Sequence, residues 1–200
     1  ENCLMRFTFT GAIDMGKKEN SLASGDVLFT DSSVNTQLKR GVGGYLFLPA
    51  ALLEACPGSI EKADIIGRLK LRRSTGAGST QMEIRTFVWA LEDYRNALTG
   101  SRHGELSVYT DSQCVADLSR RRSGLENKNY ISKRTNSEIR NASLYRELYS
   151  LYDELNMNVI KVAGHSRAAS HDTVHRIFSI VDREVRKALR SWMEELKRGV

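Results

Sequence analysis

The alternation of two hydrophobic periods along the chain restricts its fold more than any other feature of the sequence. Short apolar or alternating runs, which indicate strands, lie at residues 26–30, 45–48, 67–71, 106–110 and 158–162. Apolar residues at three- and four-residue steps, which indicate amphipathic helices, lie at residues 80–98, 139–155 and from about 173 onwards. Strands and helices therefore alternate after an opening group of strands, which predicts a mixed α/β sheet with helices on its faces.

Residues 1–24 differ from the rest of the chain, because a strand-like run at Cys3–Phe9 leads into a polar stretch. We interpret 1–24 as an N-terminal extension and 25–200 as one domain, long enough to bury a core. No run approaches the roughly 18 apolar residues of a membrane span, and no signal peptide is visible. The three cysteines are an odd number and lack CxxC spacing, which argues against a disulfide framework or a zinc site. We expect a cytoplasmic monomer that contacts no membrane.

Positive charge favours a polyanionic partner. The formal net charge is +6, and the segment from Ser119 to Arg140 is the most basic part of the chain. Its cations are Arg120, Arg121, Arg122, Lys128, Lys133, Arg134 and Arg140. Such side chains neutralise phosphates without reading base sequence. The alternative interpretation is a solvated loop without a ligand.

Four carboxylates occupy positions from which they can converge. Asp31 and Asp111 directly follow predicted strands, and ligand sites of open α/β sheets lie beyond the carboxyl ends of strands. Glu83 lies in the first turn of a predicted helix, and Asp182 lies midway along the last one. Grouped acids raise each other's pKa, and a bound divalent cation relieves the repulsion. Because all the ligands are oxygens, we expect Mg²⁺ as the preferred cation and Mn²⁺ as the next. Two such ions, about 3.5–4 Å apart, stabilise both reacting oxygens of a phosphodiester.

Each acid also has an ordinary structural explanation when it is taken alone. Asp31 can begin a turn, Asp111 can cap a helix, and Glu83 can compensate a helix dipole. Asp182 can pair with Arg183 or Arg186 on a solvated face. The occurrence of all four in one pattern is what favours a metal-dependent site.

Six short motifs follow one another along the chain. They are Thr30–Ser33 with Gly41–Tyr45, Gln81–Ile84 with Ala90–Glu92, Tyr109–Gln113, Ser143–Tyr145, Val162–His165, and Val181–Arg183. In this order they resemble the motifs of the type 1 ribonuclease H family, over about residues 26–190. The resemblance implies an RNase H-like α/β fold, in which a five-stranded mixed sheet has three antiparallel strands, then parallel ones, and helices on both faces.

The resemblance also implies an activity and its residues. Members of the family hydrolyse the RNA strand of RNA–DNA hybrids endonucleolytically with two Mg²⁺ ions and leave 5′-phosphates. By that resemblance Asp31 bridges both ions, Asp111 binds metal, Glu83 holds one ion near a ribose 2′-hydroxyl, and Asp182 completes the second ion's ligands. The implied catalytic and metal-binding residues are therefore Asp31, Glu83, Asp111 and Asp182.

A histidine and several polar side chains complete the implied site. His165 matches the family histidine that assists proton transfer or product release, but it lies 17 positions before Asp182, a longer spacing than is usual. His171 and His175 therefore stay open as alternatives. The substrate-binding candidates, which would read the 2′-hydroxyl or contact phosphates, are Ser33, Ser79, Thr80, Gln81, Gln113, Arg121 and Arg122.

Three other interpretations compete with this one. The chain can be a nuclease of the same fold that acts on DNA or structured RNA, although the Thr110–Gln113 motif argues against it. It can be a non-catalytic hybrid-binding module, which we would expect to have lost at least one of the carboxylates. It can also be a domain of a larger polypeptide such as a reverse transcriptase.

Overall fold

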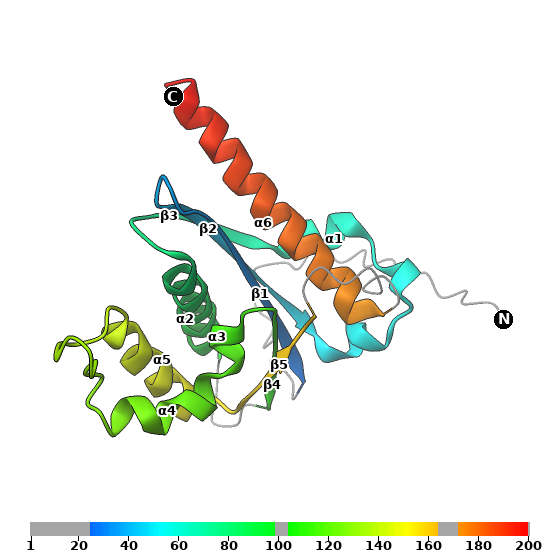
Figure 1. Ribbon diagram of the computed structural model, residues 1–200. Coiled ribbons are helices and arrows are strands. Elements are labelled where there is room, and N and C mark those ends of the chain that lie inside the picture. Colours follow the sequence, from blue (N-terminus) through cyan, green and yellow to red (C-terminus); the bar gives the residue numbers. More distant parts are fainter. Residues whose placement is uncertain (1–24, 99–103, 164–171, 200) are drawn as a thin grey trace.

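A five-stranded mixed sheet forms the centre of the molecule. The computed structural model describes residues 25–98, 104–163 and 172–199 (Figure 1). The strands are β1 (Asp26–Asn35), β2 (Arg40–Pro49), β3 (Lys70–Thr75), β4 (Leu106–Thr110) and β5 (Met157–Lys161). Their order is β3-β2-β1-β4-β5; the first three are antiparallel, and β4 and β5 continue in parallel. The predicted fold class is confirmed.

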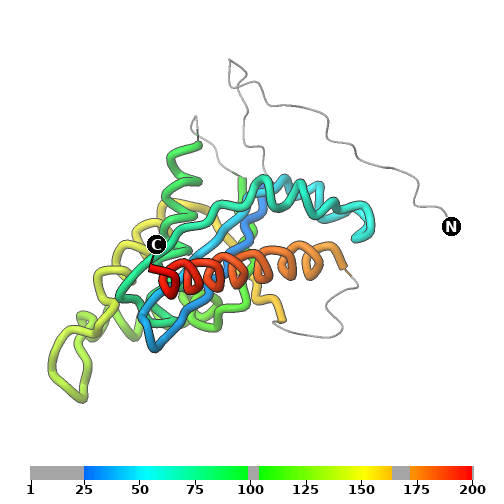
Figure 2. The backbone as a smooth tube through the Cα atoms, turned by 90° about the horizontal axis from the view of Figure 1, so that it is seen from above, coloured from blue at the N-terminus to red at the C-terminus, as the bar shows by residue number. Residues whose placement is uncertain are grey.

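Helices cover both faces of this sheet. They are α1 (Lys62–Arg68), α2 (Ser79–Ala97), α3 (Gln113–Ala116), α4 (Leu118–Glu126), α5 (Ala142–Glu154) and α6 (Thr173–Lys197), with short 3-10 turns at Ala50–Glu54 and Pro57–Ser59. Figures 1 and 2 show α2 to α5 on one side of the sheet and α6 with α1 on the other. The three long predicted helices are all present.

Alternate side chains of β1 supply the two halves of the core. Leu28 packs with Tyr45, α2 and α5 on one face of the sheet. Val27 and Phe29 pack with α6 and α1 on the other face, where they meet Val181. Because strand side chains alternate between faces, one short apolar run anchors helices on both sides. Each fully buried aliphatic or aromatic side chain contributes about 1.5–3 kcal/mol to stability.

Two adjacent glycines on β2 let the helices approach the sheet closely. A Cβ atom added at Gly43 would lie 1.9 Å from Oγ1 of Thr86 on α2. A Cβ atom added at Gly44 would lie 2.6 Å from Cγ2 of Val185 on α6. Neither distance is sterically possible, so only glycine permits both helices to pack at their observed depth. The Gly41–Tyr45 motif therefore sets the position of the helices that carry Glu83 and Asp182.

The structure corrects two predicted boundaries near the start of the domain. The first strand was expected to end at Thr30, but β1 continues to Asn35 because it pairs with β2 throughout. Asp31 consequently lies in mid-strand opposite Gly44 rather than at a strand end. The expected strand at 67–71 begins later, at Lys70, because residues 62–68 form α1.

The basic segment is also more regular than expected. The alternative interpretation of residues 119–140 was a solvated loop, but α4 spans Leu118–Glu126. Arg122 Nε donates to Glu126 Oε1 at 2.7 Å, an i,i+4 ion pair that supports this polar helix. Within the described ranges, no helix is both long and apolar enough to cross a membrane. Cys114 is a free thiol. Cys56 is disulfide-bonded, which corrects the expectation drawn from the number and spacing of the cysteines.

Candidate active site

The candidate site begins where two parallel strands separate. The parallel pairing of β1 with β4 reaches Phe29 opposite Tyr109, and β4 ends one residue later. β1 continues beyond this point and carries Asp31, while Asp111 is the first residue after β4. The main chain leaves the sheet here, at the carboxyl end of β4, where ligand sites of α/β sheets form.

All four predicted carboxylates line a single cavity of about 130 Å³ at this opening. Its lining residues are Thr30, Asp31, Ser32, Glu83, Thr86, Thr110, Asp111, Ser112, Val115, Asp182 and Arg186. The acids come from β1, α2, the end of β4 and α6, which lie far apart in the sequence. Because α2 and α6 cover opposite faces of the sheet, their acids enter the cavity from opposite sides.

Asp31 has the most perturbed electrostatics of the four acids. Burial first, and then the neighbouring Asp111 and Asp182 carboxylates, raise its pKa to about 8; the backbone hydrogen bond from Ser32 and the charge of Arg186 act in the opposite direction. Its Oδ2 atom is buried and has no hydrogen-bond partner among the described residues. A buried carboxylate oxygen without a donor indicates a missing cation or proton.

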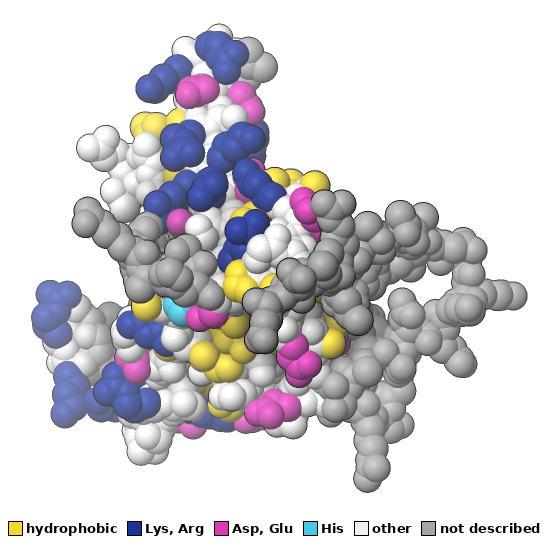
Figure 3. Space-filling model, turned by 90° about the vertical axis from the view of Figure 1, so that its right-hand side faces the viewer, with side chains coloured by type: hydrophobic (Ala, Val, Ile, Leu, Met, Phe, Trp, Pro, Cys, Tyr) yellow, Lys and Arg dark blue, Asp and Glu magenta, His cyan; other side chains and the backbone are white. Residues whose placement is uncertain are grey.

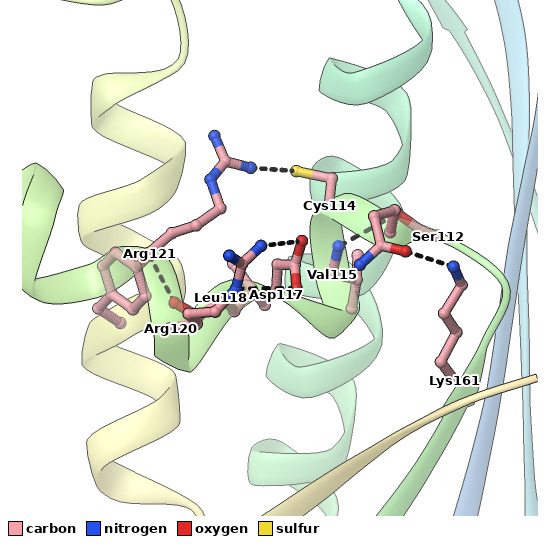
Figure 4. Close-up of polar contacts among 10 residues, drawn as sticks. Ser112, Cys114, Val115, Asp117, Leu118, Arg120, Arg121 and Lys161 are labelled. Atoms are coloured by element: carbon pink, nitrogen blue, oxygen red, sulfur yellow. Dashed lines mark hydrogen bonds and ion pairs between the residues drawn. The ribbon is translucent and has the colours of Figure 1, made fainter.

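Glu83 is held in place by two serines. Ser112 Oγ donates to Glu83 Oε2 at 2.7 Å, and Ser79 Oγ lies 3.3 Å from Oε1. The same Ser112 Oγ accepts from Val115 N at 3.1 Å and so caps α3, as Figure 4 shows. The helix cap is therefore Ser112, and this leaves the Asp111 carboxylate on the cavity wall.

Asp182 forms an ion pair inside the cavity. Its Oδ1 accepts from Arg186 Nε at 2.8 Å, the i,i+4 pair anticipated from the sequence. Both partners line the cavity, so the pair belongs to the site, although the Arg186 side chain is 38% exposed. The sequence interpretation missed Arg186 as a site residue, because helical spacing reveals the pair but not the cavity.

The donor set fits a hard divalent cation. The acids offer carboxylate oxygens only, which suit Mg²⁺ or Mn²⁺, and Asp31 supplies a buried oxygen without a donor. In the part of the chain that the structure describes, no three acidic, histidine or cysteine side chains already form a ligand cluster.

A second, larger polar cavity of about 480 Å³ adjoins the first. It is lined by Thr80, Gln113, Cys114, Asp117, Arg120 and Arg121. Lys161 Nζ donates to the Gln113 side chain, and Arg121 Nη1 lies 3.2 Å from Cys114 Sγ (Figure 4). Three of the predicted substrate-binding residues, Thr80, Gln113 and Arg121, thus share this cavity.

The other predicted substrate-binding residues lie outside both cavities. Arg122 Nη2 donates to Asp153 Oδ2 at 2.7 Å, and its Nε pairs with Glu126. Ser33 is a half-buried β1 residue opposite Val42. Gln81 is half-buried on α2, and Ser79 contacts the site only through Glu83.

The histidine assignment is not decided by the structure. His165 and His171 lie outside the described residues. His175 lies in the first turn of α6, where its Nδ1 is 2.6 Å from Asp172 Oδ2. It does not line either cavity. His165 therefore stays a prediction.

Comparisons with known proteins agree with this architecture. A family model described as RNase H matches residues 24–188. Among solved structures, the chain is similar to one titled as a foamy viral protease–reverse transcriptase in complex with dsDNA, with a TM-score of 0.54 and 12% identity. That match covers 81% of this chain and 96% of the other. It supports the fold alone. No curated protein sequence matches the chain.

Proposed function

The chain belongs to the RNase H family, and we propose on this premise that it is an endonuclease that hydrolyses the RNA strand of RNA–DNA hybrids. The observation that carries the proposal is the convergence of Asp31, Glu83, Asp111 and Asp182 on one cavity. The family match alone would also fit a binding module. Retention of all four acids in one cavity supports a catalytic role.

The four carboxylates would hold two Mg²⁺ ions, with Mn²⁺ as a substitute. Bound there, the metal would activate water and stabilise the charge on the reacting phosphodiester oxygens. Asp31 would be the central ligand, because its carboxylate interacts electrostatically with both Asp111 and Asp182. Ser112 orients Glu83, and Arg186 supplies a positive charge at the edge of the cavity.

The adjoining polar cavity is a suitable place for the substrate backbone. Arg121 can contact a phosphate, since its guanidinium lies over the Tyr145 ring at 5.3 Å and is thereby oriented. Thr80 and Gln113 offer hydroxyl and amide groups for the sugar beside the cut. A ribose 2′-hydroxyl is what distinguishes RNA from DNA at such a site. His165 would assist proton transfer or product release.

A cleavage assay tests the proposal. Labelled RNA–DNA hybrid, duplex RNA, duplex DNA and single-stranded RNA are incubated with the protein in Mg²⁺ or in EDTA. Asp111→Asn is the test variant. Asp64→Asn is the matched control, because Asp64 is an exposed α1 residue outside the carboxylate cavity. We expect Mg²⁺-dependent cutting of the hybrid's RNA strand, which is lost only in Asp111→Asn.

Other outcomes identify the competing interpretations. Cutting of duplex DNA or of structured RNA, with no preference for the hybrid, would indicate a nuclease of different specificity. Hybrid binding without any cleavage in Mg²⁺ or Mn²⁺ would indicate a binding module and overturn the proposal.

A further inference from the structure

The exposed face of α6 carries a line of positive charge. Arg183, Lys187, Arg190 and Lys197 are all exposed. Their spacings of four, three and seven residues place them along one side of a helix with 3.6 residues per turn. We call these four residues the α6 basic stripe. Figure 3 shows Lys and Arg side chains gathered over this helix.

The opposite side of α6 explains why this face is polar but not why it is basic. Val181, Val185 and Trp192 are buried against the sheet, so the other side of the helix must face water. An ordinary solvated face mixes charges of both signs. Among the described exposed positions along the stripe, Glu194 is the one acidic residue.

The cations of the stripe also differ from those of α4 and α5 in their partners. Arg120 pairs with Asp117, and Arg122 pairs with Asp153 and Glu126. In contrast, among the described residues Arg183, Arg190 and Lys197 form no salt bridge, and Lys187 lies 3.9 Å from Glu184. The stripe therefore retains positive charge for an external partner, whereas Arg120 and Arg122 of α4 are paired with acids.

The stripe is continuous with the catalytic cavity. Arg183 directly follows Asp182, and Arg186, on the neighbouring side of the same turn, lines the cavity. At about 1.5 Å per residue, the distance from Arg183 to Lys197 along the helix is about 21 Å. At about 3.4 Å per nucleotide step, this length equals roughly six steps of a duplex. Figure 1 shows the last turns of α6 extending past the sheet.

We propose that the α6 basic stripe is a second contact surface for the sugar–phosphate backbone of a nucleic-acid duplex whose scissile strand enters the carboxylate cavity. The inference rests on the proposed nuclease function. Cations along one side of a helix, three of which form no salt bridge among the described residues, suit a polyanion and contact phosphates without reading sequence. The stripe extends the binding surface away from the site, on the side opposite to the α4–α5 segment.

The test compares two double variants that each remove two positive charges. Arg183→Gln/Arg190→Gln alters the stripe. Lys70→Gln/Arg95→Gln is the matched control, because both residues are surface cations outside the two site cavities. Affinity for a fluorescent RNA–DNA hybrid is measured in EDTA by anisotropy over a series of salt concentrations. Thermal unfolding checks that both variants are folded.

We expect the stripe variant to bind the hybrid about 10- to 60-fold more weakly at about 0.1 M salt. The slope of log affinity against log salt concentration should become less steep by about two, because each of the two lost phosphate contacts accounts for about 0.9 of the slope. The control should keep the wild-type slope. Glu194→Gln, which removes the stripe's acid, should strengthen binding.

Two results would overturn the inference while leaving the nuclease function intact. The first is hybrid cleavage by wild-type protein together with equal affinities for the two double variants, since net charge alone would then explain binding. The second is a stripe variant that loses binding to phosphatidylserine vesicles but keeps its affinity for the hybrid, which would indicate a membrane surface as the partner. Wild-type protein that neither binds nor cuts any duplex would instead refute the proposed function.

Discussion

Replacement of Asp31 by asparagine should make the metal-free protein more stable at alkaline pH. Asparagine has nearly the same shape as aspartate but cannot ionise in the cavity. Burial and two neighbouring carboxylates raise the Asp31 pKa from 3.8 to about 8. Between these values the folded state binds more protons than the unfolded state, so the free energy of unfolding decreases as pH rises.

The size of this effect follows from the pKa shift. The shift is roughly four pH units, and each unit corresponds to about 1.4 kcal/mol, which gives an upper limit of about 6 kcal/mol. From about pH 5 to about pH 8, three of those units apply, so the upper limit is about 4 kcal/mol. Entry of water into the cavity will reduce this, and we expect about 2–4 kcal/mol. That is a large share of the 5–15 kcal/mol typical of a folded domain.

Urea unfolding in EDTA at several pH values measures the effect. Wild type should lose stability from about pH 5 to about pH 8, and Asp31→Asn should lose less by the stated amount. Excess Mg²⁺ should reverse the order, because a cation that binds only the folded wild type stabilises it. Asp64→Asn, at an exposed carboxylate, is the control. A stability difference between wild type and Asp31→Asn that does not change with pH would refute the electrostatic reasoning.

Three further predictions concern the scaffold of the site. Gly43→Ala should destabilise the protein by about 1–3 kcal/mol, because its Cβ would meet Thr86. Thermal unfolding measures the loss of stability, with Gly67→Ala as the control because a Cβ there meets no atom within 4 Å. Equal melting temperatures for the two variants would contradict the prediction. Ser112→Ala should cost about 1 kcal/mol through loss of the α3 cap and should lower kcat by releasing Glu83. Retention of full kcat would show that the serine does not position Glu83. Arg186→Gln should bind Mg²⁺ roughly fivefold to tenfold more tightly by calorimetry, because a competing cation leaves Asp182; weaker binding would mean that Arg186 supports the metal instead.

Several parts of the fold could be predicted from the sequence because local pattern and tertiary environment agree there. The alternation of apolar runs identified β4 and the three long helices. Each of these helices packs on the sheet through the same apolar residues that form its sequence pattern. Asp111 was placed correctly at the end of a strand, since Leu106–Thr110 is a clear strand, whereas the structure was needed to identify Ser112 as the helix cap. The order of the motifs then identified four acids that share one cavity.

Other features depend on partners that are distant in sequence. Residues 32–35 are mostly polar and do not show strand periodicity, yet pairing with β2 keeps them in β1. The helix α4 lacks an apolar stripe and contains Gly124, but ion pairs such as that of Arg122 with Glu126 support it. The short helix α1 lies in a connection whose apolar residues gave no readable period. It is fixed by the burial of Ile65 beneath α6.

The paired glycines of β2 have a consequence for redesign of this protein. At Gly43 and Gly44, α2 and α6 pack directly on the two faces of the β2 backbone, with no β2 side chain between. The thickness of that backbone therefore sets the distance between the two helices. We therefore expect the width of the carboxylate cavity to depend little on the size of core residues in more distant turns of α2 and α6. Substitutions of core residues in those distant turns should change the melting temperature first. They should change the positions of the four carboxylates only if the sheet itself distorts. Directed evolution for stability can therefore sample most of the core freely, provided that these two positions are held constant.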